Sequence, residues 1–87
     1  MSAEFMNQKV KPEIGGFNNM GKPIPFSKQQ EAYEHCLAMG LNQARSMEVV
    51  RSVTAQLERD KPYEAMSEGM KFLDLTGTYR LFAVLLV

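Results

Sequence analysis

The stretch GFNNMGKP at residues 16–23 contains most of a phosphate-binding loop. Two glycines and the following Lys22 match G-x-x-x-x-G-K, a pattern in which backbone N–H groups and the lysine hold phosphates. The next position should carry a hydroxyl for magnesium, but Pro23 has neither a hydroxyl nor an N–H. Ile24 and Pro25 then prevent a helix from starting where its N-terminus would meet the phosphates. We therefore predict a flexible turn here, with no bound nucleotide or other cofactor.

The stretch HCLAMGLNQARSMEVV at residues 35–50 has the outline of a helix-turn-helix, with Gly40 in the turn and Asn42 able to cap the second helix. The residues that would face DNA bases in such a protein are Gln43, Arg45, Ser46 and Arg51. Ser46 stands where an apolar β-branched residue usually packs the two helices. The chain also has 10 basic and 10 acidic residues, so it lacks the basic surplus of a DNA-binding domain. A dimeric DNA-binding regulator is the alternative hypothesis, and an ordinary helical hairpin is favoured.

Two further sets of side chains could do chemistry, and each has a simpler interpretation. His35 and Cys36 are the only residues of their types, and on a helix they point about 100° apart, so they cannot form a catalytic pair. They also fall short of any zinc-binding pattern. Glu64, Glu68 and Asp74 are best explained as part of a solvated charged face. The sequence therefore predicts neither an enzyme nor a metal site.

Composition places the chain among small globular proteins. It has 87 residues, of which 45% are hydrophobic and 23% charged, so it forms one domain at most. The single cysteine excludes an internal disulfide. The longest apolar run, at 81–87, is too short for a transmembrane helix, and the start of the chain has no signal-peptide pattern. We expect a cytoplasmic protein, of the cell of origin or of a host cell, without membrane contact.

The expected fold is mainly α, a three- to four-helix domain at 27–87 preceded by an extended arm at 1–26. Glycine and proline are frequent in the arm, whose apolar residues, Ile24 and Phe26 among them, are available to dock. The first helix is expected to begin at Ser27, at the head of a capping-box spacing. It should end at Gly40, because glycine favours the left-handed conformation that terminates helices.

The second helix is expected to run from Asn42 to about 59–61, with Met47 on its apolar face. Pro62 should then begin a third helix over 62–75. Gly69 costs that helix about 1 kcal/mol relative to alanine, unless close packing requires it. The apolar residues of 78–87 do not alternate, so they fit a helix or a short buried strand, and their composition slightly favours a helix.

Seven methionines and the apolar C-terminus are the most informative features for function. Methionine adapts to varied partners, and three short helices have more apolar surface than they can bury. The predicted partner-binding residues are Met66, Met70, Phe72, Leu81, Phe82 and Leu85. We therefore expect a non-enzymatic interaction module that binds a larger protein, a second copy of itself, or both. Small regulators and inhibitors, virus-encoded ones among them, are often neutral chains of this length without motifs.

Overall fold

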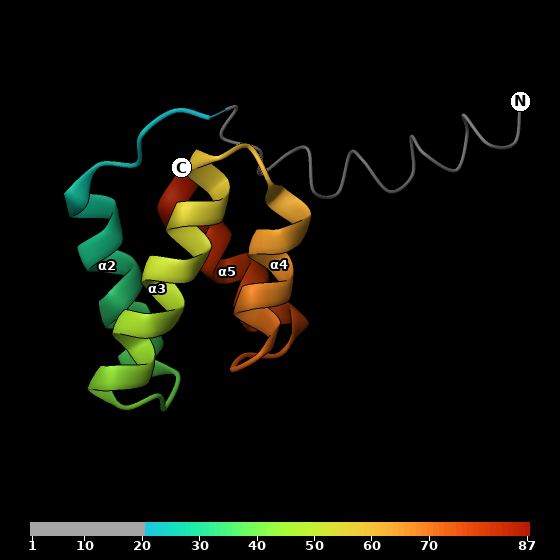
Figure 1. Cartoon of the computed structure of the whole chain (residues 1–87). Coiled ribbons are helices and arrows are strands. Elements are labelled where there is room, and N and C mark those ends of the chain that lie inside the picture. The colour runs from blue at the N-terminus through green and yellow to red at the C-terminus, as the bar shows by residue number, and fades with distance from the viewer. Residues whose placement is uncertain (1–20) are drawn as a thin grey trace, which may run out of the picture.

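Helices account for all the regular secondary structure of residues 21–87, the part of the chain that the computed structural model describes. The described helices are α2 (Phe26–Ala38), α3 (Gln43–Glu58), α4 (Pro62–Met70) and α5 (Leu75–Leu86). Successive helices run in alternating directions and are joined by short turns (Figure 1). The predicted mainly helical fold is confirmed, and the C-terminal apolar run is a helix rather than a strand. Most of the predicted arm, residues 1–20, lies outside the described residues.

The helices form a closed arrangement around a shared core. α3 packs against α2 and α4, and α5 packs against the same two helices from behind (Figure 1). Each helix therefore buries one face against two neighbours, as in a small bundle. The largest fully buried apolar side chains are Phe82, Leu57, Leu81, Val49, Val53 and Cys36.

Proline, not serine, is the N-cap of the first described helix, which begins at Phe26. The N-cap is Pro25, with φ −59° and ψ 148°, and its carbonyl accepts a hydrogen bond of 3.1 Å from the backbone N–H of Lys28. No side chain caps this helix. The prediction that Ser27 caps this helix is therefore wrong. Phe26 is already helical, and the carbonyl of the extended Pro25 accepts the first hydrogen bond of the helix.

The turn between α2 and α3 has the predicted chemistry. Gly40 has φ +102°, and the N–H of Leu41 donates to the carbonyl of Cys36 at 3.1 Å. This is the hydrogen bond of a glycine-terminated helix. The Oδ1 of Asn42 then accepts from the N–H of Arg45 at 2.8 Å. The helix end at Gly40 and the cap at Asn42 are both confirmed.

The end of α3 uses the same geometry without glycine. Asp60 has φ 61°, and the N–H of Lys61 donates to the carbonyl of Gln56 at 2.8 Å. The left-handed Asp60 lets the chain reverse at once, because aspartate tolerates this conformation better than most residues. Pro62 begins α4, as predicted.

The predicted third helix over 62–75 is wrong in its last third. α4 ends at Met70, and Asp74 caps a separate helix, α5, by accepting a hydrogen bond from the N–H of Gly77 at 2.7 Å. Residues 76–78, expected to terminate a helix, lie in the first turn of α5. The cap divides the predicted helix, since Asp74 satisfies N–H groups that would otherwise need a preceding turn.

One apolar residue of the predicted arm is anchored in the core. Ile24 is 4% exposed, and both of its backbone polar groups are held by side chains. Its N–H donates to Oε2 of Glu58 at 2.7 Å, and its carbonyl accepts from Nε2 of Gln29 at 2.9 Å. This contact joins the start of α2 to the end of α3.

Candidate functional site

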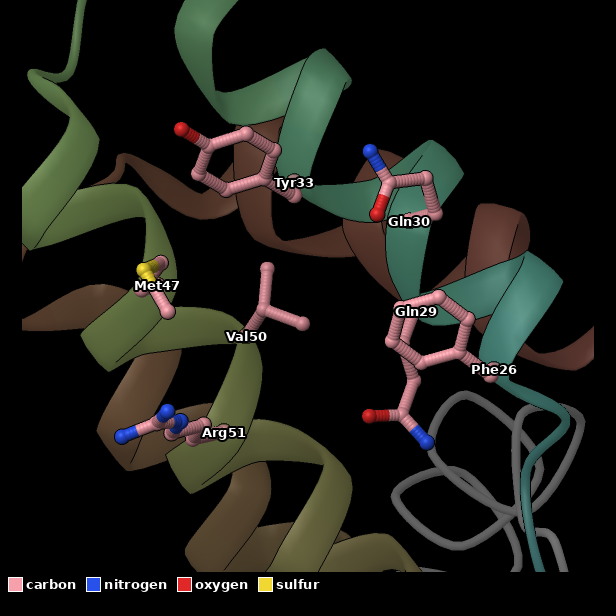
Figure 2. A pocket seen from close by; sticks show the side chains of 7 residues that line it. All are labelled: Phe26, Gln29, Gln30, Tyr33, Met47, Val50 and Arg51. Atoms are coloured by element: carbon pink, nitrogen blue, oxygen red, sulfur yellow. The ribbon is translucent and has the colours of Figure 1, made fainter.

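An open groove of about 240 Å³ lies between α2 and α3 on their outer side. α2 presents one wall and α3 the other, with Val50 between them (Figure 2). On each helix the lining residues are mainly three or four positions apart, so they share a face. The lining residues are Phe26, Gln29, Gln30, Tyr33, Met47, Val50 and Arg51.

The groove combines a buried apolar floor with exposed apolar walls. Val50 is only 5% exposed, whereas Phe26 is 76% and Met47 45% exposed. Leu37, four residues after Tyr33 on α2, continues the same apolar stripe and is also exposed. Exposed apolar side chains therefore flank a floor that is itself buried.

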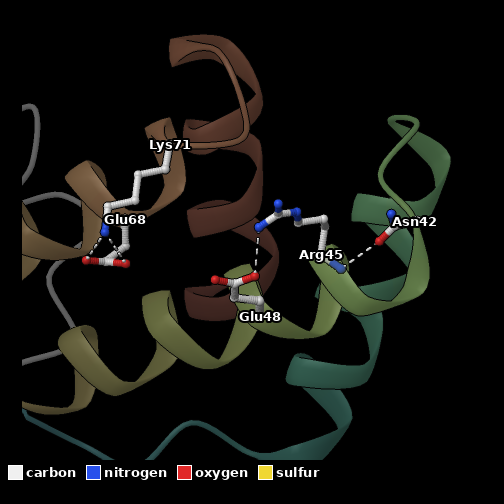
Figure 3. Close-up of polar contacts among 5 residues, drawn as sticks. All are labelled: Asn42, Arg45, Glu48, Glu68 and Lys71. Carbon is white, nitrogen blue, oxygen red and sulfur yellow. Dashed lines mark hydrogen bonds and ion pairs between the residues drawn. The ribbon is translucent and has the colours of Figure 1, made fainter.

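Arg51 gives the groove a positive charge that the described residues do not neutralise. The nearest carboxylate by helical spacing is Glu48, whose Oε1 pairs with Arg45 at 3.2 Å (Figure 3). The guanidinium of Arg45 also lies 4.9 Å from the ring centre of Phe72. Glu48 is therefore held by Arg45, and within residues 21–87 no carboxylate lies within 4.0 Å of Arg51.

The predicted DNA-contacting residues do not form one exposed surface. Ser46 is fully buried, so it cannot reach a base edge, and its place in the prediction is wrong. Arg45 is occupied by Glu48 and Phe72, while Gln43 and Arg51 are exposed. α3 returns alongside α2 as a hairpin (Figure 1).

The six predicted partner-binding residues are divided between the core and the surface. Leu81, Phe82 and Leu85 are at most 2% exposed and Met66 is 8% exposed, so these four belong to the core. They are therefore unavailable at the surface, because the apolar run itself forms α5, which packs against α2 and α4. Met70 remains 48% exposed. Phe72 is half-buried beneath Arg45.

The remaining candidates are the phosphate-loop stretch, Cys36 and a possible metal site. Residues 16–20 of the phosphate-loop candidate lie outside the described residues, and Gly21 to Pro25 are non-helical. Cys36 is in the core, and burial raises the pKa of its thiol from 9.0 to about 11. Within residues 21–87, no three side chains of His, Cys, Asp or Glu are grouped to hold a metal ion.

The groove was missed because periodicity does not identify which apolar positions a neighbouring helix covers. Met47 was expected on the apolar face of the second helix, yet it lies on the groove wall and is 45% exposed. A second stripe at Phe26, Tyr33 and Leu37 was the available signal.

Comparisons with known proteins do not add a function. No protein-family model, no curated protein and no solved structure matches the chain. The class that the structure itself defines is a small helical, bundle-like protein with an apolar groove on its α2–α3 face. Among residues 21–87, no helix has both the length and the apolar character needed to cross a bilayer.

Proposed function

We propose that this chain is a non-enzymatic protein-binding module, a small regulator or inhibitor that occupies a surface of a larger protein. The observation that carries the proposal is the apolar groove between α2 and α3, with Phe26 and Met47 exposed on its walls. Large apolar side chains around a concave floor are typical anchor sites for a partner's side chains. The proposed compartment is the cytoplasm, where the free Cys36 would stay reduced.

The contact proposed here differs from the one predicted from the sequence. There the C-terminal run was to provide the contact, whereas Leu81, Phe82 and Leu85 stabilise the fold itself. The proposed contact therefore moves to α2 and α3. A second copy of the chain remains one of the partners that the experiment distinguishes.

The test is site-specific photo-crosslinking in cells of the organism of origin. A photoreactive amino acid replaces Met47 in the groove or, as the control, Glu64, which is exposed on α4 and does not line the groove. We expect a discrete, nuclease-resistant adduct from position 47 and none from position 64. An adduct of twice the chain's mass would identify a homodimer. Equal labelling from both positions, or none from position 47, would contradict the proposal.

A further inference from the structure

We propose that the groove receives an apolar peptide segment of a partner protein whose neighbouring Asp or Glu pairs with Arg51. This inference rests on the proposed function and adds the chemistry of the bound segment. The groove lies between α2 and α3, and Arg51 is on its α3 wall (Figure 2).

The size of the groove suits a side chain rather than a free small molecule. Its volume of about 240 Å³ is below the range of typical small-molecule sites, roughly 300–1,000 Å³. The floor, Val50, and the flanking Met47 and Tyr33 offer an apolar surface to an aliphatic or aromatic anchor. Methionine adjusts its shape to such an anchor at little cost.

The charge of the bound segment follows from the ion pairs around the groove. Lys28 on α2 has Glu31 at 3.8 Å, and Arg45 on α3 has Glu48 at 3.2 Å. Arg51 has no such partner in the described part of the chain. An arginine at the edge of an apolar surface forms its strongest contact with a carboxylate, which can accept two parallel hydrogen bonds.

Two neutral polar groups of the groove can orient the backbone of the segment. The side-chain amide of Gln30 and the Tyr33 hydroxyl make no hydrogen bond within residues 21–87, whereas the side-chain amide of Gln29 donates to the carbonyl of Ile24. A peptide backbone offers both donors and acceptors to such groups. Nucleic acid is the less suitable occupant, because binding to a phosphate backbone depends on several cations and the groove has only Arg51.

The experiment is selection of a random peptide library, displayed on phage, against the immobilised full-length chain. We expect the enriched peptides to share an apolar anchor close to an Asp or Glu. A synthetic enriched peptide should bind Arg51→Glu at least tenfold more weakly than the original chain, because like charges then face each other. Replacing the peptide's acidic residue by lysine should restore binding to Arg51→Glu.

Arg80→Glu is the matched control, since Arg80 is exposed on α5 and does not line the groove. It makes the same change of net charge and should leave peptide affinity within twofold. Circular dichroism of both variants checks that they remain helical. Three results would overturn the inference. The peptide could bind the original chain and Arg51→Glu equally well, the enriched peptides could lack acidic residues, or no peptide could be enriched.

The two proposals fail separately. A crosslinked partner at position 47 combined with acid-independent peptides would retain the protein-binding function and reject the role of Arg51. Acid-dependent peptides without any crosslinked partner would reject the function in the cell. The inference would also be overturned if the original chain bound a labelled DNA duplex and Arg51→Glu did not, because Arg51 would then contact a phosphate.

Discussion

Gly69 on α4 lies so close to Thr78 on α5 that a side chain at position 69 has no room. An ideal Cβ there would be 2.6 Å from Cγ2 of Thr78. Thr78 is fully buried, and its hydroxyl donates to the carbonyl of Asp74 at 2.8 Å, so its side chain cannot rotate away without losing that hydrogen bond. The close packing that would justify a glycine within α4 is therefore present.

Replacing Gly69 by alanine should destabilise the protein despite alanine's better helix propensity. Propensity alone would add about 1 kcal/mol of stability, whereas overpacking typically costs about 1–3 kcal/mol. We expect a net loss of about 1 kcal/mol in the free energy of unfolding, measured by urea denaturation with circular dichroism.

A double-mutant cycle identifies the contact responsible. Thr78→Ser removes the methyl group and keeps the hydroxyl, so Gly69→Ala should cost less in the Thr78→Ser background. Ser67→Ala, at an exposed position of the same helix, is the control and should be neutral or slightly stabilising. An unchanged cost in both backgrounds would show that the methyl group of Thr78 is not the obstacle.

The cap of α5 is also testable. Asp74→Ala removes the acceptor of the Gly77 N–H and should lower the free energy of unfolding by about 1 kcal/mol. Asp74→Ser should recover most of that loss, because a serine oxygen can accept the same hydrogen bond. Thermal or urea unfolding measures both variants, and equal stability of Asp74→Ala and Asp74→Ser would contradict the assigned cap.

The helix boundaries show where local sequence chemistry is sufficient. Gly40, Asn42 and Pro62 each have a backbone preference that acts within one turn, and each boundary was predicted. Asp74 carries the same capping chemistry, but the apolar spacing from Met66 through Met70 to Leu73 continues past the end of α4. Periodicity therefore concealed the turn, and only the packing of α5 against α4 reveals it.

The groove could not be predicted for a different reason. Met47 and Val50 are three residues apart on one helix, yet one is 45% and the other 5% exposed. Which of them is covered depends on the position of α2, a tertiary relationship that spacing does not encode. The core role of Leu81 and Phe82 was missed likewise, since it depends on how α5 packs against α2 and α4.

The anchor at Ile24 should depend on Glu58. Glu58→Ala removes the acceptor of the Ile24 N–H, and because this bond involves a charged group we expect a loss of about 1–2 kcal/mol in the free energy of unfolding. The amide of Ile24 should also lose protection in hydrogen exchange, since it would then face solvent more often.

An exposed carboxylate on another helix provides the control for this change. Glu64→Ala alters the net charge equally at an exposed position of α4 and should leave the exchange of the Ile24 amide unchanged. If Glu58→Ala retained full protection at Ile24, the core contacts of the isoleucine side chain would be sufficient to hold this segment.

Burial of Cys36 should make stability depend on pH in the alkaline range. Its thiol pKa is raised from 9.0 to about 11 by desolvation, so the folded state holds its proton more tightly than the unfolded state. The resulting contribution is fully present below pH 9.0 and is lost as the pH rises towards about 11, because the unfolded thiol ionises first. Its size is on the order of 3 kcal/mol.

Cys36→Ala isolates this contribution from every other pH-dependent contribution to stability. The variant is less stable at neutral pH because it leaves a cavity, and the difference from the original chain should shrink as the pH rises from 9 to 11. Urea unfolding at several pH values measures this difference.

Alkylation by iodoacetamide at pH 8 should also be much slower in the folded chain than in denaturant, because the buried thiol is neutral and inaccessible. A constant stability difference, together with equally rapid alkylation in both states, would place Cys36 at the surface.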